Sequence, residues 1–355
     1  MQEFEGVIAA PISSRDVLSE DMTTSGEALL KYPIAEMRRQ TLWPPTANGL
    51  GIDAGDLNLL AKHEISSDVI TEFHTEGPNY QDRIERNYEV SVSQNEVAAL
   101  WRELVEFFSK YGLKPIDEIA CIGTVYFDNR DYDMTRYTVL NPARRMLVRL
   151  RTYEPFGESP KPLSSYWIEV KTSIKGQWRK KRFRLNRADL VGFLEGREVT
   201  QSVLEDSENG VEPGVIRNLY REIQELILTM GLRPFFLLTY KRLAIQNEAE
   251  RVSLDWDNQY YSVGTDVFTY DSWKYPIEES AGKSNKTILE LKYPQGTQPG
   301  WIGALEKNYR IQETGFLKFV EGVGCLFRGP LKNYSETDYF LRLIKAYGGE
   351  GRPLG

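Results

Sequence analysis

The segment Met146-Leu147-Val148-Arg149-Leu150-Arg151 alternates apolar and cationic side chains with a period of two residues. Successive side chains of a β-strand point to opposite faces, so Arg149 and Arg151 share one face while Val148 and Leu150 share the other. The segment therefore predicts a strand with one charged face and one apolar face.

The same pattern occurs in four more segments, namely 167–171, 237–242, 251–255 and 288–292. In each of them the charged or polar residues fall mostly on one face, and Val, Leu or Ile mostly on the other. A single segment of this kind is typical of the exposed side of a half-buried sheet. Five together favour a polar interior that binds something charged.

The rest of the chain supplies further strands and several helices. Strands are predicted at 84–90, 119–127, 145–153, 166–173, 180–185, 235–245, 251–258 and 287–293. Helices are predicted at 97–110, 186–193, 213–230, 301–307 and 337–346. A capping box that starts at Ser93 precedes the first of them, and Asn186 can cap the second. We expect an α+β fold in which an antiparallel eight-stranded β-barrel forms a tunnel with helices packed outside.

Three regions are expected along the chain. Residues 1–78 contain several prolines and little periodicity, which predicts an irregular N-terminal extension with a short helix at 26–40. Residues 79–330 form the predicted tunnel domain, and 331–355 a C-terminal helix and tail.

Composition excludes several classes of function. A formal net charge of -7 argues against a generic or sequence-specific nucleic-acid binder. Only two histidines and two cysteines are present, which argues against a His-rich metal site or a disulfide framework. Neither a membrane span nor a secretory signal is visible, so a cytoplasmic protein is expected.

The charged faces themselves indicate a ligand. They carry eight cations, Arg149, Arg151, Lys171, Arg182, Arg242, Arg251, Lys292 and Lys318, and three carboxylates, Glu169, Asp255 and Glu290. Like charges at barrel spacing repel strongly where water is scarce, and an anionic guest relieves that repulsion. Arginine donates two parallel hydrogen bonds to phosphate, while lysine acts as a point charge. A linear triphosphate or a longer polyphosphate fits this charge and shape.

The carboxylates suggest a divalent metal, because a carboxylate faces phosphate favourably only through a bridging cation. Mg²⁺ or Mn²⁺ is commonly held by one or two carboxylates and phosphate oxygens. Glu290 is the best candidate, whereas Glu169 and Asp255 can simply pair with neighbouring cations. No glycine-rich phosphate loop offers an alternative site.

The order of these segments resembles the catalytic domain of the vacuolar transporter chaperone (VTC) family, polyphosphate polymerases of the triphosphate tunnel metalloenzyme superfamily. The resemblance spans about residues 82–328. It includes the segments 125–129, 149–151, 168–171, 182–183, 232–234, 240–242, 251–255, 288–292 and 316–319.

The resemblance implies an enzyme that transfers the γ-phosphate of ATP to a growing inorganic polyphosphate chain without a covalent intermediate. It implies catalytic roles for Arg149, Arg151, Lys171, Arg242, Glu290 and Lys318, with Glu290 holding Mn²⁺ or Mg²⁺. Phosphate contacts are expected from Arg149, Arg151, Lys171, Arg182, Tyr240, Arg242, Arg251, Lys292 and Lys318.

Two positions depart from the family pattern. Asn87 stands where the first strand usually has a lysine, and Leu317 stands where a serine hydroxyl is usual. Two alternatives therefore stay open: a triphosphatase or related phosphohydrolase of the same fold, and a non-catalytic module that binds polyphosphate.

Overall fold

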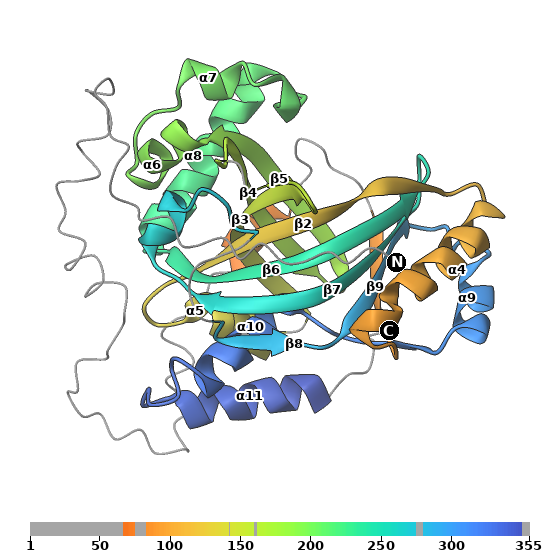
Figure 1. Cartoon of the computed structure of the whole chain (residues 1–355). Coiled ribbons are helices and arrows are strands. Elements are labelled where there is room, and N and C mark those ends of the chain that lie inside the picture. The colour runs from red at the N-terminus through yellow and green to blue at the C-terminus, as the bar shows by residue number, and fades with distance from the viewer. Residues whose placement is uncertain (1–66, 75–82, 142, 160–161, 275–279, 350–355) are drawn as a thin grey trace, which may run out of the picture. The chain divides into compact units, whose positions relative to one another are not determined.

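The structure is a computed structural model that describes residues 67–74, 83–141, 143–159, 162–274 and 280–349 (Figure 1). All of them belong to a compact unit that spans Thr41–Gly355. The helix predicted at 26–40 lies outside the described residues.

An antiparallel sheet dominates this unit, and the expected α+β class with a large antiparallel sheet is confirmed. Its strands are β1 (Arg83–Val90), β2 (Lys114–Asp128), β3 (Arg144–Pro155), β4 (Ser165–Ile174), β5 (Gln177–Asn186), β6 (Arg233–Gln246), β7 (Arg251–Ser262), β8 (Gly282–Ser284), β9 (Thr287–Pro294) and β10 (Ile311–Glu313). The order is β10-β1-β5-β4-β3-β2-β6-β7-β8, and β9 pairs with both β1 and β7.

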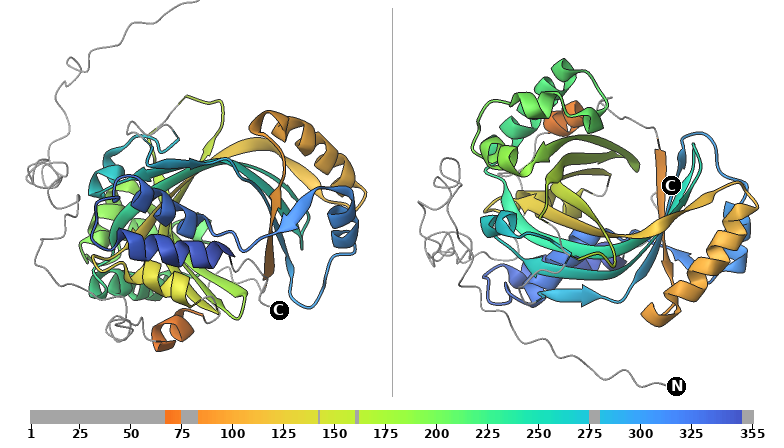
Figure 2. Two further views of the ribbon diagram at one scale, coloured as in Figure 1. Left: turned by 90° about the horizontal axis from the view of Figure 1, so that it is seen from below. Right: turned by 45° about the horizontal axis from the view of Figure 1, so that its top comes forward.

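The sheet is strongly curved (Figure 2). β1 pairs along its whole length with β9 but meets β5 through one residue pair, Arg83 with Trp178. The predicted eight-stranded barrel is not confirmed, because ten strands belong to the described sheet and the β1–β5 seam is not a continuous ladder. The short strands β8 and β10 were not predicted from the sequence, since three residues are too few to show a period.

The predicted alternation decides which side chains face the concave side. On β3 and β4, Val148, Leu150, Ile168 and Val170 are at most 1% exposed and belong to the larger apolar core. The charged residues between them point the other way, and the strand register brings Arg149 opposite Glu169. The apolar core therefore lies outside the curved sheet and leaves the charged side chains within it.

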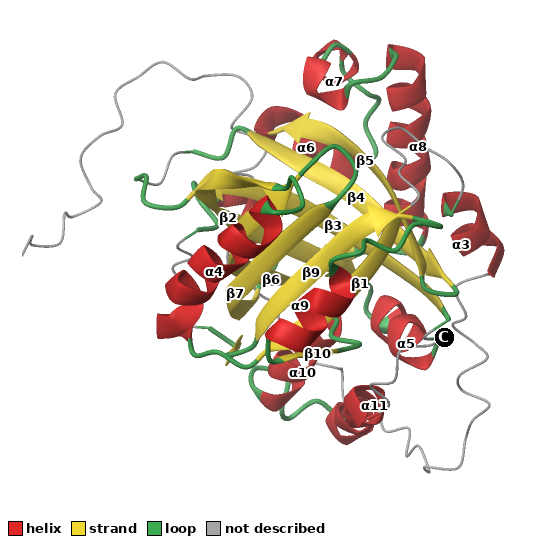
Figure 3. Ribbon diagram, turned by 90° about the vertical axis from the view of Figure 1, so that its right-hand side faces the viewer, coloured by secondary structure: helices red, strands yellow, loops and turns green. Residues whose placement is uncertain are grey.

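The helices cover the outside and one end of the sheet. They are α3 (Ser67–Phe73), α4 (Val97–Ser109), α5 (Asp133–Leu140), α6 (Arg187–Leu194), α7 (Gln201–Leu204), α8 (Pro213–Thr229), α9 (Ile302–Asn308), α10 (Lys318–Arg328) and α11 (Thr337–Gly349). α4 and α9 pack in a second apolar core with β1, β7 and β9 (Figure 3). None of the helices in the described ranges is long and apolar enough to cross a membrane.

Local signals set several helix boundaries as predicted. The capping box at Ser93 forms, with the Glu96 side chain accepting from the Ser93 backbone N–H at 2.8 Å. Asn186 caps α6 by accepting from the Asp189 backbone N–H. Helix α3, with Ile70 fully buried, lies in the region predicted to be irregular.

Helix α10 was not predicted, and it positions part of the site. Gly322 lets this helix pack closely on β6 and β7: a Cβ there would lie 2.5 Å from the Phe236 ring and 2.9 Å from Tyr260. Phe319 packs on Phe236 with ring centroids 5.7 Å apart. This close packing fixes the first helical residue, Lys318, at the concave side of the sheet.

Candidate functional site

A polar cavity occupies the concave side of the sheet. Its empty volume, including the part open to solvent, is about 600 Å³. It is lined by Glu85, Asn87, Tyr126, Leu147, Arg149, Arg151, Lys171, Trp178, Tyr240, Arg242, Glu290, Lys292, Phe316, Leu317 and Lys318. All six residues to which a catalytic role was assigned from the sequence therefore meet in one cavity.

Six cations reach this cavity from five elements. They are Arg149 and Arg151 on β3, Lys171 on β4, Arg242 on β6, Lys292 on β9, and Lys318 at the start of α10. Among the residues that the structure describes, two carboxylates line the same space, Glu85 and Glu290. Two more, Glu169 and Asp255, are fully buried behind the cations. The side chains that line the cavity therefore carry more positive than negative charge.

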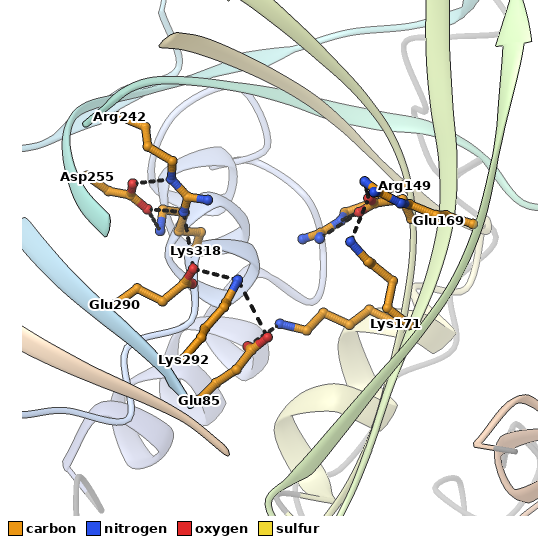
Figure 4. Close-up of polar contacts among 11 residues, drawn as sticks. Glu85, Arg149, Glu169, Lys171, Arg242, Asp255, Glu290, Lys292 and Lys318 are labelled. Carbon is orange, nitrogen blue, oxygen red and sulfur yellow. Dashed lines mark hydrogen bonds and ion pairs between the residues drawn. The ribbon is translucent and has the colours of Figure 1, made fainter. Parts of the chain in front are cut away.

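Asp255 fixes two of the cations. Its carboxylate accepts two hydrogen bonds from Arg242, each 2.6 Å long, and one from the Lys318 ammonium at 2.7 Å (Figure 4). Burial acts to raise the pKa of Asp255, but the charges of Arg242 and Lys318 lower it below its ordinary value. The aspartate is thus held ionised and orders two donors that come from different parts of the chain.

Glu169 has the same role on the opposite wall. Arg149 donates to its Oε2 from Nε at 2.8 Å and approaches it from Nη2 at 2.7 Å. Lys180 and Arg182 lie 3.5 and 3.6 Å from Oε1. Burial opposes ionisation of Glu169, yet Lys180, Arg149 and Arg151 hold its pKa well below the ordinary value.

Arg151 is the least neutralised cation of the cavity. It is 8% exposed, and its Nε donates to the Thr124 hydroxyl at 3.2 Å. In the described parts of the chain no carboxylate forms a salt bridge with it. Its guanidinium is therefore available to an anion from outside.

Of three further residues predicted to contact phosphate, one lines the cavity and two lie outside its lining. Tyr240 lines the cavity, and its ring lies under Arg242 and Lys318, with the charges 5.4 and 4.9 Å from its centroid. Arg182 stacks on Trp167 at 4.1 Å and does not line the cavity. Arg251 also lies outside the lining, and burial together with the charge of Arg242 lowers its pKa.

Glu85 was not assigned to the site from the sequence. Its Oε2 accepts a hydrogen bond of 2.6 Å from Lys171, and its Oε1 lies 3.6 Å from the Lys292 ammonium. Burial acts to raise the pKa of Glu85, but Lys171 and Lys292 lower it to about 2. The available signal was the alternation of Glu85, Asn87 and Glu89 in the first strand.

The donor set fits a divalent metal only when substrate supplies most of the ligands. The described residues contain no group of three His, Cys, Asp or Glu side chains that could hold a metal alone. Glu290 lines the cavity at 12% exposure, 2.8 Å from the Lys292 ammonium and 3.3 Å from Arg242. One such carboxylate plus phosphate oxygens is a usual arrangement for Mg²⁺ or Mn²⁺.

Comparison with known proteins finds weak structural and clearer sequence similarity. A putative adenylate cyclase from Bacillus halodurans is 12% identical, with a TM-score of 0.33, and the match covers 64% of this chain and 87% of that one. A putative adenylyl cyclase from Hippeastrum, described as having a dominant triphosphatase activity, is 13% identical with a TM-score of 0.37, covering 68% and 95%. Similarity at this level supports no argument about function.

Sequence similarity is more informative. Subunit 4 of the vacuolar transporter chaperone complex of Schizosaccharomyces pombe is 25% identical over 240 residues, which are 59% of this chain. The match spans about one third of that relative, 32% of its length. The VTC domain model matches residues 74–327, well over half of the chain. The chain therefore belongs to the VTC domain family.

Proposed function

We propose that this chain is a metal-dependent polyphosphate polymerase, which transfers the γ-phosphate of ATP to the end of a polyphosphate chain. The observation that carries the proposal is the cavity lined by six cations and two carboxylates. Cations crowded in a partly buried space repel one another, so an anionic ligand that lies along them gains strong electrostatic stabilisation.

The arrangement of the cations suits a linear phosphate chain. Arg149 and Arg151 lie two residues apart on β3, so their guanidinium groups follow the strand at successive positions of one face. Lys318 and Arg242 face them from other elements (Figure 4). Guanidinium and ammonium groups that reach the cavity from several sides can each contact a different phosphate of a chain. A single compact anion would contact fewer of them.

The proposed reaction needs no nucleophile from the protein. A terminal phosphate oxygen of the acceptor attacks the γ-phosphorus of ATP, the bond from that phosphorus to the β–γ bridging oxygen breaks, and ADP leaves. In such transfers catalysis consists of positioning plus charge stabilisation. Arg149, Arg151, Lys171, Arg242 and Lys318 would align donor and acceptor and take up the charge that develops on the phosphoryl oxygens.

Glu290 would hold the divalent metal. When bound, Mg²⁺ or Mn²⁺ neutralises phosphate charge and so lets a carboxylate face the substrate. Asn87 lies directly opposite Glu290 in the β1–β9 ladder, so this side chain borders the same position.

Membership of the VTC family supports a polyphosphate-related activity. A second candidate, binding of polyphosphate without turnover, is favoured by Asn87 and Leu317, both of which line the cavity. The family resemblance implies a lysine and a hydroxyl at these positions, so the cavity has one cation and one hydroxyl fewer to contact phosphate. Hydrolysis of triphosphate, with water replacing the acceptor phosphate, would use the same cations.

One assay separates the three functions. The chain is incubated with ATP and Mn²⁺, and polyphosphate and free phosphate are both measured. Polymerase activity predicts polyphosphate, with a loss of about 100-fold or more in Arg149→Ala and Glu290→Gln. Arg221→Ala, which removes an exposed arginine that pairs with Glu198 at 3.0 Å, is the matched control and retains full activity.

Release of phosphate without chain growth would select the hydrolase. If no turnover occurs with any divalent metal while tripolyphosphate still binds, the chain is a binding module.

A further inference from the structure

Glu85 connects two walls of the cavity. It lies on β1, and it contacts Lys171 of β4 at 2.6 Å and Lys292 of β9 at 3.6 Å. In Figure 4 the contact with Lys171 joins the side that carries Arg149 and Glu169 to the side that carries Glu290 and Lys292. The backbone seam between β1 and β5 has one residue pair, so this ion pair spans the least continuous part of the sheet.

Two carboxylates behind the cavity wall are held more firmly than Glu85. Asp255 and Glu169 are fully buried, and each is fixed by an arginine through two contacts. Glu85 is 14% exposed, and its salt bridges within the described ranges are with lysines. A lysine ammonium sits on a flexible stem and can turn to a new acceptor, whereas a guanidinium paired through two nitrogens is fixed in direction.

Lys171 and Lys292 present a site for anionic oxygens. Both ammonium groups lie against the Glu85 carboxylate: Lys171 donates to Oε2 at 2.6 Å, and Lys292 lies 3.6 Å from Oε1 and 2.8 Å from Glu290. A phosphoryl group presents acceptor oxygens of the same kind. Both lysines line the same cavity as Arg149 and Lys318. A phosphate chain that follows the six cations must therefore compete with Glu85 for Lys171, and with both Glu85 and Glu290 for Lys292.

We propose that Lys171 and Lys292 form a phosphate subsite that Glu85 occupies in the free protein, and that a phosphoryl group of a linear polyphosphate displaces it. This inference rests on the proposed function. It makes Glu85 an internal competitor, which weakens binding of every ligand that uses the subsite. A linear polyphosphate recovers the lost affinity through its contacts with the other cations of the cavity.

The test measures binding of tripolyphosphate to the full chain in the presence of EDTA. Glu85→Gln keeps the size of the side chain and removes its charge, so it is expected to bind about tenfold more tightly than wild type, which corresponds to about 1.4 kcal/mol. Glu89→Gln is the matched control. It lies on the same strand outside the cavity, pairs with Lys286 at 3.1 Å, and is expected to leave affinity unchanged.

A second neutral variant, Glu85→Ala, is included in case Glu85→Gln does not fold. The thermal unfolding midpoint of each variant is measured with and without tripolyphosphate. Either neutral variant binding more tightly than wild type supports the subsite, including the case in which wild type shows no binding. Equal or weaker binding by both folded variants overturns it. If wild type then still binds and Arg149→Ala does not, the proposed function stands without the subsite. If none of them binds, both proposals fail.

Discussion

Arg242 and Asp255 face each other across β6 and β7, with Nε bonded to Oδ1 and Nη2 to Oδ2, each at 2.6 Å. The two residues are direct partners in the strand register. Asp255 also accepts from Lys318 at 2.7 Å, so one fully buried carboxylate orders a strand cation and a helix cation together. The geometry of this part of the cavity depends on that single side chain.

Asp255→Asn is therefore expected to lower the free energy of unfolding by about 3–5 kcal/mol, because it removes the counter-charge that Arg242 and Lys318 share and leaves only the longer contact of Arg242 with Glu290. Urea denaturation measures the loss. Asp257→Asn is the control, since Asp257 pairs with the half-exposed Lys241 and the exposed Lys283, and a cost of about 1 kcal/mol is expected. Equal losses in the two variants would contradict a special role for Asp255.

The pH dependence of binding provides a second prediction. Burial is the main cause that lowers the pKa of Lys171 from its ordinary value of 10.5 to about 8, with Glu85 acting in the opposite direction. The free protein loses this charge as the pH rises through about 8, so affinity for tripolyphosphate is expected to fall above that pH. Lys171→Arg stays charged, and the difference between the two affinity profiles from pH 7 to 9.5 isolates the contribution of Lys171.

The titration of Lys171 changes the stability of the fold in the direction opposite to its effect on binding. Its pKa is lower in the folded than in the unfolded chain, so between about pH 8 and 10.5 the unfolded chain binds more protons. The contribution of Lys171 therefore makes the free energy of unfolding rise with pH across that window. A profile for Lys171→Arg that matches wild type in both binding and stability would show that Lys171 does not titrate there.

Asn87 offers a gain-of-function prediction. It lines the cavity and pairs across the ladder with Glu290, so Asn87→Lys adds a cation close to the proposed metal position. A several-fold lower KM for ATP is expected in steady-state kinetics. Asn308→Lys adds the same charge at an exposed position on α9 and serves as control. An unchanged KM in Asn87→Lys would show that ATP does not approach this position.

The sequence predicts the chemistry of the cavity better than its detailed connections. A two-residue period is a local property, so the shared face of Arg149 and Arg151 follows from neighbouring positions alone. The caps at Ser93 and Asn186 are equally local and are confirmed. All six cations that line the cavity were already on the predicted inner face.

Properties that depend on distant parts of the chain were not predictable. Glu85 meets Lys171 across 86 residues, and only the three-dimensional arrangement shows that contact. Helix α10 was not predicted. The segment Phe316–Phe319 was identified only as part of the family pattern, and the packing of the helix depends on Gly322 against Phe236. The single residue pair between β1 and β5 likewise results from tertiary packing, and no strand pattern predicts it.

The most direct test of the central claim is a crystal structure of the chain with a non-hydrolysable ATP analogue and Mn²⁺. The account predicts that the phosphates lie in the cavity within hydrogen-bond distance of Arg149, Arg151 and Lys318, with Mn²⁺ bound between them and Glu290. An analogue bound elsewhere, with the cavity cations still paired only to Glu85, Glu169, Asp255 and Glu290, would contradict it.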